Sequence, residues 1–131
     1  MTELYPFLSN IIELEKFRYH YLDEGSGGEP LLMLHGNPTW SFYYRNLILG
    51  LKDSYRCVVP DHMGMGFSDK PQNYPYTLSQ HIKNLEKLLD YLNLDNITLV
   101  IHDWGGPIGM GFAVRHPERI KRLVIFNTAA F

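Results

Sequence analysis

Several features that direct proteins to particular environments are scarce in this sequence. One cysteine among 131 residues excludes an internal disulfide framework and favours a reducing compartment, so we expect a cytoplasmic protein. The apolar runs are only a few residues long, too short to span a bilayer, and the first residues show no signal-peptide pattern. A net charge of −2 without a basic run predicts no binding to nucleic acid or to an anionic membrane.

Sequence motifs for cofactors are missing too. No group of His, Cys, Asp or Glu has the spacing of metal ligands, and the sequence contains no P-loop and no complete dinucleotide-binding glycine motif. We therefore expect neither a metal nor an organic cofactor. What is present is an ordinary globular composition, 45% hydrophobic and 20% charged, in a length that suits one domain.

The alternation of apolar runs with helical patterns predicts an α/β fold. Four runs predict strands buried on both faces, because they are apolar without alternation: residues 31–34, 55–59, 97–101 and 123–126. Helical patterns separate them at residues 40–51, 77–92 and 104–115. This order gives a mostly parallel sheet with flanking helices. An earlier run, residues 17–22, alternates apolar and polar, so we expect an antiparallel edge strand there with one solvated face.

Ligands of such sheets bind beyond the carboxyl ends of the strands, so the residues that follow each strand are the candidates for a site. Histidines occur there, and we interpret them as structural. His35 and His102 are expected to hold loop backbone, with His20 on the edge strand and His81 on a helix face. His116 lies at the far end of the helix that begins at Trp104, too far to act at that helix's start.

The stretch at residues 97–109 contains the strongest chemical signal. A buried strand ends directly at Asp103, and a helix with glycines at its start follows, which is the layout of a nucleophile elbow. A carboxylate at a helix N-terminus is kept ionised by N–H groups and the helix dipole, so it needs no base to act as a nucleophile. We predict that Asp103 is this nucleophile. An N-cap aspartate with no further role is the alternative, but it leaves Gly105, Gly106 and Gly109 unexplained.

Asn37 and Trp104 are the candidate anion-binding residues. The backbone N–H that follows the nucleophile forms one half of an oxyanion hole, which assigns this role to Trp104. Asn37 follows the exit of an earlier strand, where the second N–H usually originates. The indole N–H of Trp104 and the side-chain amide of Asn37 are further donors for the same anion. Alternatively, Trp104 packs in the core and Asn37 begins a simple turn with Pro38.

Residues 35–41, 60–68 and 102–106 together resemble the α/β-hydrolase fold, and more narrowly the haloalkane dehalogenases. The resemblance extends along nearly the whole chain. It implies that Asp103 displaces halide from a small apolar substrate to form an alkyl-enzyme ester, which a histidine-activated water then cleaves. It also implies that the side chains of Asn37 and Trp104 hold the halide, while their backbone N–H groups form the oxyanion hole.

Related families leave alternatives for the reaction. Residues 123–131 resemble a subgroup of dehalogenases that is shared with the β-lactone decarboxylases of olefin biosynthesis. In those decarboxylases the aspartate attacks a cis-3-alkyl-4-acyloxetan-2-one, carbon dioxide is released, and an alkene is the product. The sequence does not separate these two reactions. Epoxide hydrolases also use an aspartate but usually have an aromatic residue in place of Asn37. Because position 103 is Asp, a serine esterase is excluded.

The triad acid and histidine of this fold follow the nucleophile, but only 28 residues follow Asp103 and none is a plausible base. Asn127 occupies a position where some dehalogenases have the acid, so we expect the acid on a later strand. The cap domain is absent too. We therefore expect residues 1–131 to be the incomplete N-terminal portion of one α/β-hydrolase domain. Alone it would be a non-catalytic fragment or binding module that at most traps an ester, and its open sheet edge would favour aggregation.

Overall fold

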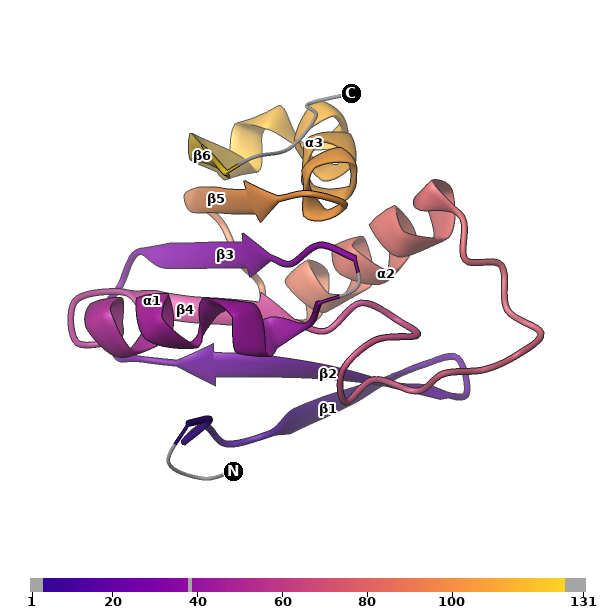
Figure 1. Ribbon diagram of the computed structural model, residues 1–131. Coiled ribbons are helices and arrows are strands. Elements are labelled where there is room, and N and C mark those ends of the chain that lie inside the picture. Colours follow the sequence, from indigo (N-terminus) through magenta and orange to yellow (C-terminus); the bar gives the residue numbers. More distant parts are fainter. Residues whose placement is uncertain (1–3, 38, 127–131) are drawn as a thin grey trace.

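The computed structural model describes residues 4–37 and 39–126, so the predicted turn at Pro38 and the strand exit at Asn127 lie outside the described residues. Figure 1 shows a sheet with helices on both sides. The strands are β1 (Asn10–Leu14), β2 (Phe17–Glu24), β3 (Pro30–Leu34), β4 (Arg56–Pro60), β5 (Ile97–His102) and β6 (Ile120–Phe126). The α-helices are α1 (Arg45–Leu51), α2 (Leu78–Tyr91) and α3 (Gly105–Arg115), with short 3₁₀ helices η1 (Ser41–Tyr44) and η2 (Pro117–Arg119).

The strands pair in the order β1-β2-β4-β3-β5-β6. The four strands from β4 to β6 in this order are parallel, whereas β2 pairs antiparallel with both β1 and β4. The α/β fold class and the mostly parallel sheet are therefore confirmed. In this topology β3 lies between β4 and β5, so the segments that follow these three strands meet at one edge of the sheet.

Two apolar layers cover the sheet, because neighbouring strand residues point to opposite faces. Leu32 and Leu34 of β3 pack with α2 and α3 on one face, and Leu31 and Met33 pack with η1, α1 and Tyr5 on the other. Burial on both faces explains why β3 has no polar alternation.

Helix α2 lies within the predicted range of residues 77–92, with Thr77 as its N-cap. The side chain of Thr77 accepts a hydrogen bond from the backbone N–H of Gln80 at 3.1 Å, which is the first half of a capping box. The Gln80 side chain does not return this bond but donates to Asn84. The buried face of the helix then consists of six residues: His81, Ile82, Asn84, Leu85, Leu88 and Leu89.

Two expectations about the strands are wrong, and one strand was not predicted. β2 is antiparallel, as expected, but it is not an edge strand with a solvated face, because the unpredicted strand β1 pairs on its outer side and His20 is buried. β1 has only two buried residues, Ile12 and Leu14, too few for a clear alternation. β6 was expected to be buried, but it is the outermost strand of the described sheet and Ile125 is 49% exposed.

Candidate active site at the strand ends

Asp103 occupies a strained turn between β5 and α3. Its φ is +52°, in the left-handed region that costs a residue with a Cβ about 1–2 kcal/mol. Turning the chain this sharply leaves the side chain exposed at the end of the sheet, although both flanking elements are packed in the core. This is the strained strand-to-helix turn that defines a nucleophile elbow.

Two backbone N–H groups converge on the Asp103 carboxylate. The N–H of Asn37 donates to Oδ2 at 3.0 Å, and the N–H of Trp104 also bonds to the carboxylate. These bonds, that of Asn37 foremost, hold the pKa of Asp103 below its usual value because they stabilise the charged form. The carboxylate is therefore ionised at neutral pH.

Gly36 allows the β3 loop to come this close to Asp103. A Cβ added at Gly36 would lie 2.4 Å from the Cβ of Asp103, which is too close for two carbon atoms that are not bonded to each other. A residue with a side chain would therefore push the loop, and the Asn37 N–H with it, away from the carboxylate.

A pocket of about 400 Å³ opens beside this carboxylate, since two residues that bond to Asp103 also line it. Its lining comes from four segments of the chain, the loops after β3 and β4, the start of α2 with the residues before it, and the start of α3: Asn37, Met63, Gly64, Met65, Tyr76, His81 and Trp104. The side chains of Met63, Met65 and Trp104 make part of its wall apolar, while amide, phenol and imidazole groups make the rest polar. Such a pocket suits an apolar molecule with one polar or anionic end.

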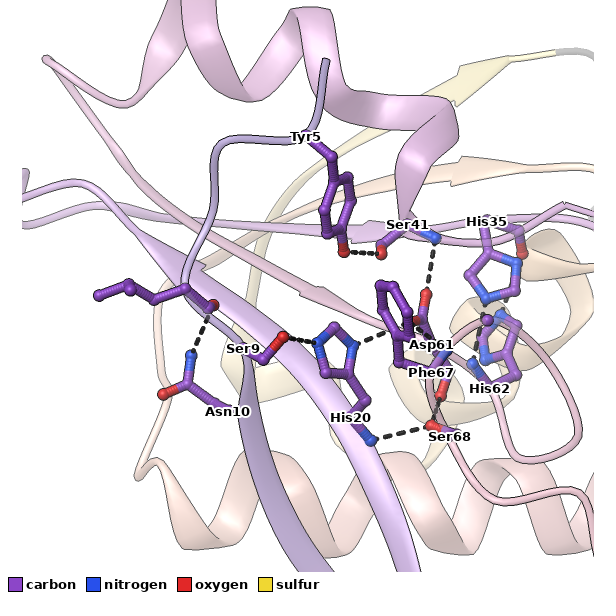
Figure 2. A network of polar contacts seen from close by, with 12 residues as sticks. Tyr5, Ser9, Asn10, His20, His35, Ser41, Asp61, His62, Phe67 and Ser68 are labelled. Carbon is purple, nitrogen blue, oxygen red and sulfur yellow. Dashed lines mark hydrogen bonds and ion pairs between the residues drawn. The ribbon is translucent and has the colours of Figure 1, made fainter. Parts of the chain in front are cut away.

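The histidines at the strand ends are in two different situations. His35 donates from Nδ1 to the carbonyl of Gly36 at 2.7 Å and accepts at Nε2 from the backbone N–H of His62 at 3.0 Å (Figure 2). Burial also lowers its pKa, so His35 is neutral and holds backbone, as predicted. The ring of His102 instead stacks on the ring of Tyr43, with 4.4 Å between the two ring centroids. Its Nδ1 has no hydrogen-bond partner among the described residues. Its expected role in holding loop backbone therefore stays a prediction.

Other residues at the site were not recognised in the sequence. Tyr76 and His81 line the pocket from the segment before α2 and from α2 itself, and no local pattern marks them. His116 is remote, as predicted, and pairs with Glu86 at 2.9 Å. Within residues 4–37 and 39–126, no cluster of three or more His, Cys, Asp or Glu could hold a metal ion. In the same ranges no helix is both long and apolar enough to cross a membrane.

The arrangement matches known proteins along most of the chain. Residues 29–130 match the model of the alpha/beta hydrolase fold family. The chain is 60% identical to cis-3-alkyl-4-alkyloxetan-2-one decarboxylase of Shewanella oneidensis, over all of this chain and 42% of that protein. It is 44% identical to haloalkane dehalogenase 2 of Mycobacterium tuberculosis, over 96% of this chain and 44% of that protein. The solved tetrameric haloalkane dehalogenase DpaA of Paraglaciecola agarilytica superposes with a TM-score of 0.91 at 37% identity, over 96% of this chain and 45% of that one.

The chain thus spans less than half the length of the relatives it matches, 42% of the first and 45% of the solved structure. The match nevertheless includes β3, β4, β5 and the turn at Asp103, which are the parts that build the site. From its sheet, its strained turn and its family match, the chain belongs to the α/β-hydrolase fold family.

Proposed function

We propose that Asp103 is the nucleophile of an enzyme that cleaves a carbon–oxygen or carbon–halogen bond of a small apolar substrate. We propose also that residues 1–131 are the N-terminal portion of the α/β-hydrolase domain of that enzyme. The observation that carries the proposal is the convergence of the Asn37 and Trp104 N–H groups on an ionised carboxylate at a left-handed turn. This turn presents the carboxylate to solvent beside a pocket with a partly apolar wall.

Each neighbour of Asp103 then has a part in the reaction. One carboxylate oxygen attacks carbon, and negative charge moves to the group that leaves. The side-chain amide of Asn37 and the indole N–H of Trp104 are donors that stabilise this anion. The backbone N–H groups of the same two residues stabilise an oxyanion when an ester on Asp103 is attacked. The apolar wall of the pocket holds the alkyl part of the substrate.

The reaction we favour is decarboxylation of a cis-3,4-disubstituted β-lactone, because the relative at 60% identity is a decarboxylase of this class. The Asp103 carboxylate attacks C4 and breaks the bond from C4 to the ring oxygen, which gives an alkyl ester and a free carboxylate. Loss of carbon dioxide then breaks the C2–C3 bond. Its electron pair forms the C3=C4 double bond and expels the Asp103 carboxylate, so the enzyme is regenerated without water.

Halide displacement is the second candidate, supported by the dehalogenase relatives at 44% and 37% identity. Here Asp103 displaces halide from an alkyl carbon, and water must cleave the resulting ester. That step needs a histidine to activate the water. His35 cannot serve, since both of its ring nitrogens are used in hydrogen bonds to the backbone.

Product analysis tests the proposal and separates the two reactions. The whole enzyme of which residues 1–131 are proposed to be the N-terminal portion is incubated with a cis-3,4-dialkyl β-lactone or with a 1-bromoalkane, and alkene and bromide are quantified. We expect alkene from the lactone with this enzyme and none with its Asp103→Asn variant. Asp53→Asn, which changes an exposed carboxylate after α1, is the matched control and should behave as the unmodified chain. Bromide release without alkene would favour the dehalogenase reaction, and equal products from Asp103→Asn would overturn the role of Asp103.

A further inference from the structure

We propose that Asp61, held by His20, is a positioning residue whose buried carboxylate fixes both loops that form the pocket beside Asp103. The inference rests on the proposed function of Asp103 and extends it to a second carboxylate that does not touch the substrate. Asp61 follows β4 directly, and His20 lies on β2, the strand that pairs with β4. Both side chains are buried, with 0% and 1% of their surface exposed.

Three donors bind the Asp61 carboxylate. Oδ1 accepts the backbone N–H of Ser41 at 2.6 Å, and Oδ2 accepts the backbone N–H of Phe67 at 3.1 Å and Nδ1 of His20 at 2.8 Å (Figure 2). Although burial opposes the charge, the bonds from His20, Phe67 and Ser41 outweigh it and lower the pKa of Asp61. The carboxylate is thus ionised and accepts only, so Nδ1 of His20 is the donor.

The first loop fixed by Asp61 is the one that carries Asn37. At its far end the Ser41 N–H binds Asp61, and at its near end the Asn37 N–H binds Asp103. Between them the N–H and hydroxyl of Thr39 both donate to the carbonyl of Gly36, at 3.3 Å and 3.1 Å. The loop is therefore anchored to one carboxylate at each end, and its position at Asp103 depends on its anchor at Asp61.

The second loop is the glycine-rich segment after β4, which supplies Met63, Gly64 and Met65 to the pocket wall. It curls around Asp61, because the Phe67 N–H returns to the carboxylate and the Ser68 hydroxyl donates to the Asp61 carbonyl at 2.6 Å. Gly66 makes this possible. Its φ is +56°, and a Cβ there would lie 2.5 Å from Cγ of Asp61.

The same residues also have the connectivity of a Ser-His-Asp triad, since the Ser9 hydroxyl lies 3.0 Å from Nε2 of His20. One observation favours positioning over a second nucleophile. The Asp61 carboxylate binds two loop N–H groups besides the imidazole, whereas a triad acid serves mainly to orient the histidine.

The test measures the pKa of the Asp103 carboxyl group in the folded chain by ¹³C NMR. Asp61→Asn removes a negative charge, which by Coulomb's law alone lowers the pKa of Asp103. The positioning role predicts the opposite result, a rise toward the usual value, because the Asn37 N–H leaves the carboxylate. His20→Leu should raise the pKa likewise. His20→Asn should restore the unmodified value, since its amide can donate to Asp61 in place of Nδ1.

Two control variants separate positioning from stability and from the triad alternative. Leu89→Ala lowers the free energy of unfolding through a cavity under α2 but should leave the pKa of Asp103 unchanged. Ser9→Ala should leave it unchanged as well, because both loop contacts of Asp61 remain. In parallel, ester formation at Asp103 with a bromoalkane should slow about tenfold in Asp61→Asn and stay at its normal rate in Ser9→Ala.

An unchanged or lowered pKa of Asp103 in both folded Asp61→Asn and folded His20→Leu would overturn the proposal. His20→Leu keeps it testable if Asp61→Asn does not fold. The pKa measurement needs no substrate, so a failed positioning role and a failed nucleophile give different results: an unmoved pKa in the first case, and a moved pKa without any ester in the second.

Discussion

The backbone N–H of Asn37 donates to Oδ2 of Asp103 across a 3.0 Å hydrogen bond that joins the ends of two neighbouring parallel strands, β3 and β5. The two residues are 66 positions apart in sequence. Their contact places a donor from one loop on the anion of another, so the geometry of the site depends on the register of the sheet and on the loop that follows β3.

That contact is sensitive to side-chain volume at position 36. Gly36→Ala places a methyl group against Cβ of Asp103 and should lower the free energy of unfolding by about 1–3 kcal/mol. It should also raise the pKa of Asp103 toward its usual value. Gly50→Ala in α1, where an added Cβ meets nothing within 4 Å, is the control and should raise stability by about 0.5–1 kcal/mol. Urea denaturation measures the free energy of unfolding of both variants. Equal changes in this free energy would contradict the clash between position 36 and Asp103.

Three buried histidines make stability depend on pH. Burial lowers the pKa of His35, of His62 and of His81, so all three rings are neutral in the folded chain. Below the unfolded pKa of about 6.5, the unfolded chain takes up protons that the folded chain does not. The free energy of unfolding should therefore fall as the pH drops from 6.5 toward 5, by at most about 1.4 kcal/mol per pH unit for each ring.

Urea denaturation between pH 7.5 and 5 measures this dependence. His81→Leu removes one of the three rings and should flatten it. Asp61 contributes only at lower pH, because its own pKa is lowered and its stabilisation is lost as the pH falls through that value. A free energy of unfolding that stays constant between pH 6.5 and 5 would contradict the prediction.

Arg119 fixes the C-terminal end of α2. Its guanidinium donates to the carbonyls of Leu89 and Leu94 and pairs with Asp90 at 2.8 Å, while only 16% of its side chain is exposed. Arg119→Ala leaves these acceptors unpaired and should cost about 2 kcal/mol. Arg115→Ala breaks only a pair with Glu86 in which Arg115 is 44% exposed, and should cost less than about 1 kcal/mol. Thermal denaturation of both variants compares them, and similar losses would be evidence against this role of Arg119.

The outer strand β6 has a row of exposed apolar side chains. Leu123, Val124, Ile125 and Phe126 are 36–49% exposed, and in the described sheet β6 pairs only with β5. A strand of this kind invites edge-to-edge pairing between copies. Ile125→Lys should lower the tendency of the chain to associate as its concentration rises, measured by size-exclusion chromatography. Val114→Lys, on the exposed surface of α3, should not change it; equal effects would contradict a role of the edge.

The sequence predicted the elements whose residues are apolar without interruption, such as β3 and β5, and the turn at Asp103, because these signals are local. It also placed Asn37 and Trp104 near Asp103, since parallel strands end at one edge of the sheet. It did not predict the bond between His20 and Asp61. These residues meet only because β2 pairs antiparallel with β4, and a pairing between distant strands leaves no local pattern. An open sheet edge was expected, but the burial predicted for residues 123–126 was wrong, because the strand order places β6 at the edge of the described sheet.

The role of Asp103 as the nucleophile is tested most directly by the mass of the chain after reaction with a 1-bromoalkane. If Asp103 is the nucleophile, intact-protein mass spectrometry should show the addition of one alkyl group, and peptide mapping should locate it on Asp103. Asp103→Asn should gain no mass, whereas Asp53→Asn should react as the unmodified chain does. An alkyl group found on another residue, or an equal mass gain in Asp103→Asn, would contradict the account.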